Sequence, residues 1–220
     1  MNDEGYLVWA GAGNAPQDGL ARNLWGTQTV VNGITYRWGE PILDVDQFGV
    51  AKFYKLGSSI PDLNFGLTPD LRYKGWGLYA ELRGQIGGHV YNMAKQSLYN
   101  NLIHADLDQT GKPDGAKKTV DYYQRALYSS NRFNEAFIES GTFLKIGALS
   151  ARYRFTNAQL NRVLGNAAPQ SLVVGATARN LYTFTGYSGL DPESGRALSR
   201  VETLSYPQLR TLTFTMDITF

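Results

Sequence analysis

The C-terminal segment of the chain alternates between apolar and polar side chains at every step. The apolar residues occupy every second position, at Leu212, Phe214, Met216, Ile218 and the terminal Phe220. Threonines and one aspartate, Asp217, fill the positions between them. Since successive side chains of a strand point to opposite faces, this strand has one apolar and one polar face. The pattern predicts a strand of a membrane barrel, with lipid on one side and a wet lumen on the other.

The composition argues against several other classes of protein. The chain has 220 residues, a net charge of +2 and no cysteine. It therefore lacks disulfides and thiolate metal sites, and it has no basic tract of the kind that binds nucleic acid. No apolar run approaches the roughly 18 residues of a membrane-spanning helix. The mean hydropathy of −0.30 is that of a soluble protein, but barrel strands alternate and average to similar values.

The N-terminus predicts that the chain is the tail of a longer protein. Met1 to Gly5 have neither the positive charge nor the apolar run of a signal peptide, which an exported protein needs. Residues 1–26 contain several glycines, asparagines and a proline, and we expect them to be a loop-like lead-in.

A hairpin around Lys74 and Gly75 is the best internal indication of a sheet. Both arms alternate, and a two-residue turn sets Tyr73 opposite Trp76. The same register pairs Leu71 with Leu78, Leu67 with Leu82, Phe65 with Gly84 and Leu63 with Ile86. A slip of one residue would move one arm's apolar side chains to the wrong face. Pro69 has no N–H for the ladder, so we expect a bulge or a missing hydrogen bond there.

The connections between the predicted strands alternate in length. Strands are predicted near residues 62–73, 76–91, 140–155, 170–185 and 208–220, with a weaker one within 27–38. The segments 92–135 and 186–206 are long, whereas 74–75 is a tight turn and 156–169 is intermediate. Outer-membrane barrels join strands by short periplasmic turns and long external loops. Aromatic residues near the strand ends fit two interfacial girdles: Tyr73, Trp76, Tyr153, Phe155 and Phe220 inside, and Tyr182, Phe184 and Tyr187 outside.

Five or six strands cannot close a barrel, because the smallest such barrels have about eight. An open wall of that size would expose its edges. We therefore predict an all-β fold: an antiparallel transmembrane β-barrel section with long external loops, forming part of a larger barrel. Residues 27–220 would form this section.

No pattern in the sequence indicates catalysis, a cofactor or a metal site. Asp106–Gly111 begins like a calcium loop, but Lys117 stands where that loop needs a glutamate. Gly11–Gly13 begins like a dinucleotide loop, but Pro16 takes the place of the third glycine and no βαβ unit follows. The only histidines, His89 and His104, have no partner at metal-ligand spacing. We predict that the chain is not an enzyme and binds no cofactor.

The long segment 92–135 contains the candidates for substrate contact. A short helix is predicted over 116–128, with Val120, Tyr123 and Leu127 on one face. Its tyrosines, Tyr122, Tyr123 and Tyr128, would stack on a sugar or peptide at the barrel mouth. The alternative, and the commoner role of such rings, is to pack the loop onto the barrel rim.

Several charged residues share the predicted lumen face: Asp70, Glu81, Arg83, Arg152, Arg154 and Arg179. They could line a substrate path. Because buried charges need partners, the alternative is that they pair with one another or with another part of the protein inside the barrel.

Six segments together carry a family resemblance. They are Gly57–Gly66, Tyr73–Trp76, Gly87–Asn92, Phe137–Ile146, Ala178–Glu193 and Tyr206–Thr211. With these segments in this order, residues 35–220 resemble the C-terminal part of TonB-dependent outer-membrane transporters of the SusC/RagA type.

The resemblance implies a barrel of about 22 strands with a plugged lumen, embedded in bacterial outer-membrane lipid. It implies energy from the TonB complex, through an N-terminal part missing from this chain, and a SusD-like surface lipoprotein as partner. Oligosaccharides or peptides would be the substrates. The terminal aromatic strand would be the signal read by the barrel-assembly machinery. Two alternatives stay open: a siderophore or vitamin receptor of the wider TonB class, and a soluble β-sandwich that binds carbohydrate.

Overall fold

The computed structural model of the chain describes residues 7–8, 27–37, 39–113, 117–118, 120–125, 128–131, 133–193, 195 and 199–220. The chain divides into two compact units. The first comprises residues 1–57, 91–138 and 201–204, and the second comprises 58–90, 139–200 and 205–220. No helix within the described ranges is both long and apolar enough to cross a membrane.

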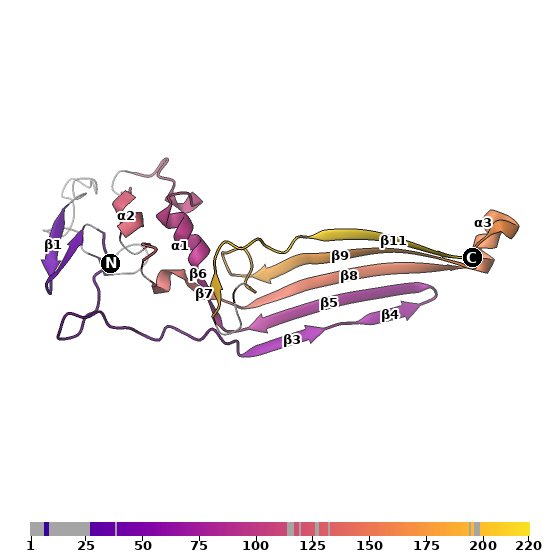
Figure 1. Ribbon diagram of the computed structural model, residues 1–220, viewed down its shortest axis with the longest axis horizontal. Coiled ribbons are helices and arrows are strands. Elements are labelled where there is room, and N and C mark those ends of the chain that lie inside the picture. The colour runs from indigo at the N-terminus through magenta and orange to yellow at the C-terminus, as the bar shows by residue number, and fades with distance from the viewer. Residues whose placement is uncertain are drawn as a thin grey trace. The chain divides into compact units, whose positions relative to one another are not determined.

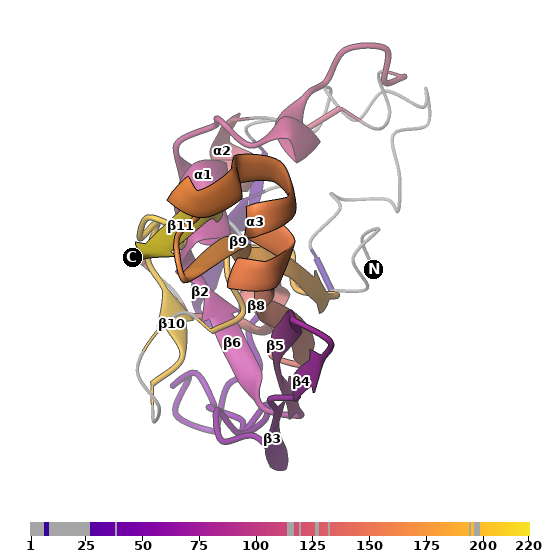
Figure 2. The same ribbon diagram turned by 90° about the vertical axis from the view of Figure 1, so that its right-hand side faces the viewer.

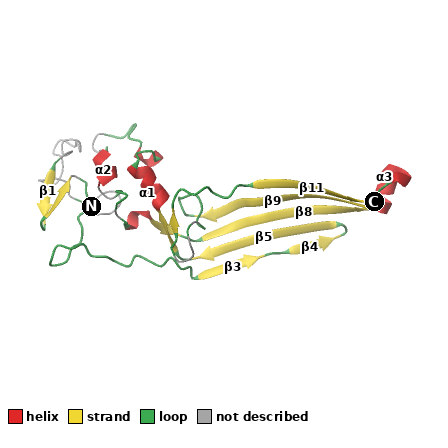
Figure 3. Ribbon diagram, in the orientation of Figure 1, coloured by secondary structure: helices red, strands yellow, loops and turns green. Residues whose placement is uncertain are grey.

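The second unit is built on one antiparallel sheet with the strand order β11-β9-β8-β5-β3 (Figure 1). These strands are β3 (Leu63–Leu67), β5 (Trp76–Ile86), β8 (Phe143–Thr156), β9 (Ser171–Thr185) and β11 (Thr211–Thr219). A further strand, β4 (Asp70–Tyr73), also pairs with β5. The long strands lie side by side in Figure 3, and they confirm the all-β prediction.

The predicted hairpin register is confirmed at each of its apolar pairs. Tyr73 lies opposite Trp76, Leu71 opposite Leu78, Leu67 opposite Leu82, Phe65 opposite Gly84 and Leu63 opposite Ile86. Lys74 and Gly75 both have positive φ, at 45° and 90°, as a type I′ turn requires. The strand breaks between β3 and β4, where Pro69 accepts a hydrogen bond from the N–H of Ala80 at 3.1 Å. The register is the same on both sides of the break, so Pro69 removes a bond without creating a bulge.

A bulge at Gly147 shifts the alternation of β8. Leu82 of β5 lies opposite Ile146, but its neighbour Glu81 lies opposite Ala148, so Gly147 is the extra residue. The register with β9 shifts at the same place. The bulge sets Lys145 opposite Arg83, on the polar face of the sheet.

The apolar face of the sheet is exposed. Leu71, Leu78, Leu149, Phe184 and Phe214 have exposed fractions between 41% and 75%. The buried apolar residues among the described part of this unit are Val90, Phe143, Ala148, Leu160 and Tyr187. This core is too small for a β-sandwich, whose two sheets would bury their apolar faces against each other. Tyr187, which we predicted in the outer aromatic girdle, is only 6% exposed. Because a girdle residue faces the membrane interface, Tyr187 does not belong to the girdle.

A helix that we did not predict occupies the connection between β8 and β9. α3 (Asn157–Leu164) is followed by the 3₁₀ turn η5 (Gly165–Ala167). Thr156 and Gln159 form a capping box, in which the Thr156 N–H donates to Gln159 Oε1 at 2.8 Å. Gly165, with φ 63°, ends the helix. The helix lies at the same end of the strands as the C-terminus, as Figures 1 and 2 show.

The first unit contains a separate hairpin and several short helices. β1 (Gln28–Val31) and β2 (Ile34–Arg37) form a two-stranded sheet. Strand structure within 27–38 is therefore confirmed, as a hairpin whose two strands pair with each other; its place in the barrel section stays a prediction. The turn residues Asn32 and Gly33 have φ of 51° and 79°, and this local turn chemistry closes the hairpin. The predicted lead-in, residues 1–26, lies almost wholly outside the described residues, so its boundary stays a prediction.

The long connection of the first unit is folded rather than extended. It contains α1 (Met93–Asn100), η2 (Ala105–Leu107), α2 (Val120–Arg125) and η4 (Glu135–Phe137). Two short strands, β6 (His89–Asn92) and β7 (Ile138–Ser140), stand where the chain passes between the units. A third, β10 (Val201–Glu202), pairs in parallel with the second half of β6.

Candidate functional site

The polar face of the sheet is organised in rows that run across the strands. One row contains Arg72, Gly77, Arg152, Gly175 and Thr215. Another contains Glu81, Ala148, Arg179 and Thr211. Part of each row lines a hollow of about 740 Å³, with Gly77 and Arg152 from the first row and Glu81, Ala148, Arg179 and Thr211 from the second. The register thus places the predicted lumenal charges on one face, opposite the exposed leucines.

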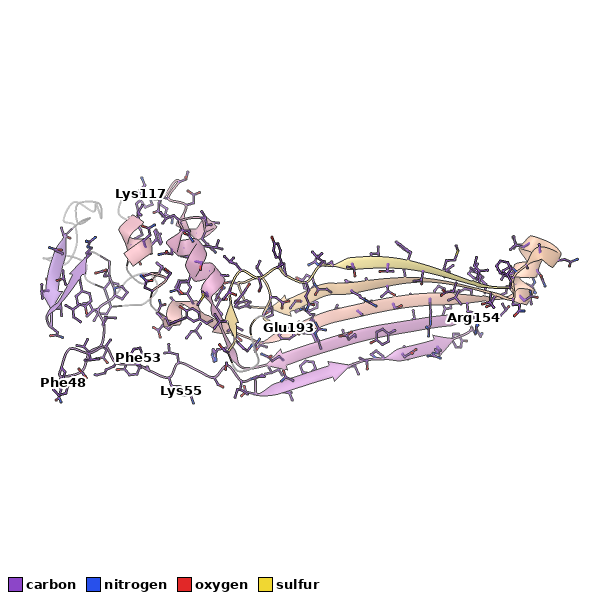
Figure 4. The ribbon with its side chains drawn as sticks, in the orientation of Figure 1. Phe48, Phe53, Lys55, Lys117, Arg154 and Glu193 are labelled. Carbon is purple, nitrogen blue, oxygen red and sulfur yellow. The ribbon has the colours of Figure 1, made fainter. Side chains whose placement is uncertain are left out.

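Lys145 lies at the centre of a group of ion pairs on this face. Its side chain is 1% exposed, and its Nζ lies 3.0 Å from Asp191 Oδ2 and also donates to Glu193. Arg83 donates Nε and Nη2 to the same Glu193 carboxylate, at 3.0 and 3.1 Å. A further bond joins Arg83 Nη1 to Glu81 at 2.9 Å. We call Arg83, Lys145, Asp191 and Glu193 the Lys145 cluster; Figure 4 shows Glu193 at the end of the strands opposite to Arg154.

Electrostatics keep Glu193 ionised in this cluster. Burial alone would raise the pKa of Glu193, but the hydrogen bonds from Arg83 and Lys145 outweigh burial and hold its pKa below the ordinary value. A buried cation next to two carboxylates is the arrangement in which each charge compensates the others. The cluster therefore fixes the segment that carries Asp191 and Glu193 to the sheet.

Two further contacts order the same segment: one joins it to Glu139 of β7, and the other lies within the segment. Ser188 donates its backbone N–H and its hydroxyl to the Glu139 carboxylate, both at 2.7 Å. Arg200 donates Nη2 to the carbonyl of Pro192, and burial lowers the pKa of Arg200. The described part of the segment 186–200 is thus an ordered loop on the polar face.

The candidate tyrosines lie in an aromatic cluster of the first unit. Tyr122, Tyr123 and Tyr128 are 2%, 8% and 6% exposed, and they pack with Tyr99 and Phe137. The ring centroids of Tyr99 and Tyr128 are 4.8 Å apart, and those of Tyr122 and Tyr123 are 5.2 Å apart. Their role in substrate contact stays a prediction, since in this structure the rings contact one another.

The predicted helix of this segment is shorter than expected. It covers Val120–Arg125, and Val120 is 54% exposed. We predicted one apolar face from Val120, Tyr123 and Leu127. Tyr123 is buried but Val120 is not, so this face does not include Val120. Leu127 and Ala116 lie outside the described residues.

The residues predicted to form the assembly strand lie on β11 and just after it. Four of them pair with small or branched residues of β9: Leu212 with Ala178, Phe214 with Ala176, Met216 with Val174 and Ile218 with Leu172. All five, including Phe220, are between 47% and 84% exposed. Their role in barrel assembly stays a prediction.

The acidic and histidine side chains of the calcium-like segment and its surroundings form local hydrogen bonds. Asp106 accepts a bond from the Tyr99 hydroxyl at 2.6 Å, and Asp108 accepts one from the Thr110 N–H at 2.8 Å. His89 donates its backbone N–H to Ser58 at 2.8 Å. Within the described ranges, no group of three or more His, Cys, Asp or Glu residues could hold a metal ion. The Gly11–Gly13 segment lies outside those ranges.

Sequence reasoning missed the Lys145 cluster, although one local signal pointed to it. The apolar residues Leu144 and Ile146 have even numbers, whereas the apolar residues from Leu149 onward have odd numbers. Such a break in alternation indicates a bulge, which would have put Lys145 on the polar face. The acidic partners are 46 and 48 residues away, and no local pattern identifies them.

Comparison with known proteins gives a consistent result. No family model matches the chain. It is 25% identical over 207 residues to "TonB-dependent receptor P3" of Formosa agariphila, covering 89% of the chain and 20% of the relative. It is 23% identical over 167 residues to "TonB-dependent receptor SusC" of Bacteroides thetaiotaomicron, covering 72% of the chain and 15% of the relative.

Solved structures agree in fold. The RagAB peptide importer in its "open-open" state matches 88% of the chain and 24% of the solved chain, with a TM-score of 0.52 and 20% identity. Its "closed-closed" state matches 80% of the chain and 20% of the solved chain, with a TM-score of 0.51 and 23% identity. The chain spans about a fifth of the length of these relatives. In sequence and in barrel-wall fold, the chain therefore resembles the TonB-dependent outer-membrane transporters of the SusC/RagA type.

Proposed function

We propose that the chain forms part of the barrel wall of a TonB-dependent importer in a bacterial outer membrane. The observation that carries this proposal is the segregation of the two faces of the sheet. Exposed leucines and phenylalanines occupy one face and charged side chains occupy the other, in one register across the strands. A single-layer sheet of this kind needs lipid on its apolar face.

The proposal includes the partners and the substrate class of such importers. Oligosaccharides or peptides would pass the polar face, and a SusD-like lipoprotein would cover the mouth. The TonB complex would supply energy through a part of the protein outside this chain. Support comes from the similarity to SusC and from the fold shared with a peptide importer. The wall residues would act by shape and charge, with no covalent chemistry.

The test is expression of the gene that carries this chain, tagged at its native locus. We expect the product in the outer-membrane fraction, and we expect deletion to abolish uptake of either oligosaccharides or peptides. A protonophore should stop the same uptake, because TonB-linked transport draws on the inner-membrane gradient. Detergent-free expression of the chain as a soluble, monomeric protein that melts cooperatively would refute the barrel-wall assignment.

A further inference from the structure

The turn end of the polar face carries an excess of positive charge. Four cations, Arg72, Lys74, Arg152 and Arg154, line one hollow of about 520 Å³ beside the Lys74–Gly75 turn. The hollow has no carboxylate in its lining. Arg154 is labelled at this end of the strands in Figure 4. Like charges gathered in one hollow repel one another unless an anion joins them.

The charges of this hollow are only partly neutralised within the protein. Arg72 donates Nε and Nη2 to Asp70, at 3.3 and 3.1 Å. Its side chain is 72% exposed, so this pair is weak. Arg152 and Arg154 make no ion pair with any carboxylate of the described residues. Lys74 Nζ lies 5.1 Å from the centroid of the Tyr73 ring, a contact that leaves its charge in place.

The backbone around Arg152 is shaped to hold its side chain in the hollow. Gly77 and Gly175 flank Arg152 on the neighbouring strands. A Cβ at Gly77 would lie 2.6 Å from Arg152 Nε and 3.0 Å from its Cγ, so the side chain lies flat across the glycine. The Arg154 N–H donates to the carbonyl of Gly75 at 2.9 Å, which fixes that arginine beside the turn.

We propose that this hollow, lined by Arg72, Lys74, Arg152 and Arg154, is a binding site for a phosphate-class anion. Guanidinium groups bind phosphate and sulfate oxygens in pairs, and a lysine adds a point charge. The anion would come either from solution or from the head group of an acidic lipid at the rim of the wall, because Tyr73 and Trp76 of the apolar face line the same hollow. The site follows from the geometry of the sheet and is independent of what the protein transports.

The test measures anion binding to the full-length protein that contains this chain, purified in a nonionic detergent. Isothermal titration calorimetry with inorganic phosphate and with sulfate forms the first arm. The second arm compares nanodiscs of phosphatidylglycerol with nanodiscs of phosphatidylcholine. Trp76 lines the hollow, so the part of the tryptophan fluorescence response that is lost in W76F gives an independent readout. Saturation by free phosphate assigns a soluble anion, whereas a response to phosphatidylglycerol alone assigns a lipid head group.

Substitutions separate this site from general charge effects. Each of R152Q and R154Q should weaken binding about tenfold or more, as the loss of a charge-assisted hydrogen bond predicts. R162Q, on α3 and outside the lining of the hollow, is the matched control and should change nothing. G77A keeps every charge but displaces the Arg152 side chain, so it should also weaken binding. If the glutamine variants fail to fold, R152K and R154K preserve the charge and should bind with smaller losses.

The dependence of anion binding on salt concentration is the last test of the proposal. Raising the ionic strength from about 0.1 M to about 1 M shortens the Debye length from about 10 Å to about 3 Å, and binding should weaken accordingly. The proposal is overturned if neither free anion nor phosphatidylglycerol shows saturable binding at low salt. It is equally overturned if R152Q combined with R154Q binds as tightly as the unmodified chain.

Discussion

Replacing Lys145 by methionine should release the loop 186–200 from the polar face. Methionine keeps the length of the side chain but removes the charge that compensates Asp191 and Glu193. Breaking a fully buried pair costs about 3–5 kcal/mol. The two acidic side chains are 16% and 27% exposed, and Arg83 still holds Glu193. We therefore expect about 2 kcal/mol, which is about a 30-fold change in the opening equilibrium of the loop.

Hydrogen–deuterium exchange of peptides from residues 186–200 measures this opening directly. Lys52 provides the matched control, since its Nζ lies 2.9 Å from Asp44 with both side chains about half exposed. K52M should change exchange around its own pair only slightly, because exposed ion pairs contribute little to stability. Adding D191N to K145M should restore part of the protection, because it removes a carboxylate that has lost its partner.

A specific result would refute the reasoning. If K145M leaves exchange of the 186–200 loop unchanged, or alters it no more than K52M alters its own surroundings, the cluster does not hold the loop. Fast exchange over the whole sheet would instead mean that Lys145 supports the fold rather than the loop.

Three further predictions follow from the same structure. The pKa of Glu193 is lowered in the folded state, so its stabilisation is complete above the ordinary glutamate pKa of about 4.3. That stabilisation is lost as the pH falls through the lowered pKa of Glu193 in the folded state. Hydrogen–deuterium exchange of the 186–200 loop should therefore rise below about pH 4. The variant E193Q should not show this rise. G84A should destabilise the sheet by about 1–3 kcal/mol in denaturant unfolding, since its Cβ would lie 2.4 Å from Phe65 Cζ and 2.9 Å from the Phe143 carbonyl. G66A, whose Cβ would meet only the Leu82 carbonyl at 3.8 Å, should cost clearly less, and equal losses would contradict this. Deletion of Phe220 from the full-length protein should reduce its level in the outer membrane more than its substrate affinity, and normal membrane levels would refute the assembly role.

The hairpin could be predicted from the sequence because its determinants are local. Lys74 and Gly75 fix the turn, and the alternation on both arms admits one register. The break at Pro69 followed from the missing N–H alone. The capping box at Thr156 and Gln159 is equally local, and reading it would have predicted α3 within the connection 156–169.

The remainder depends on contacts between residues far apart in the chain. Lys145 meets carboxylates 46 and 48 positions away, and only the folded sheet brings them together. The same holds for Tyr99 of α1 and Tyr128 beyond the end of α2, whose rings stack. Alternation describes which face a residue occupies, but it does not describe which loop covers that face.

Site-specific labelling from the lipid phase tests the barrel-wall assignment most directly. A photoreactive hydrophobic probe in native outer membranes should label Leu212, Phe214 and Met216, whose side chains lie on the exposed apolar face. Thr213 and Thr215, between them on the polar face, should stay unlabelled. Alternating labelling along β11 is the predicted result. Silence at Leu212, Phe214 and Met216, or equal labelling of the threonines, would contradict a wall with lipid on one face and a wet lumen on the other.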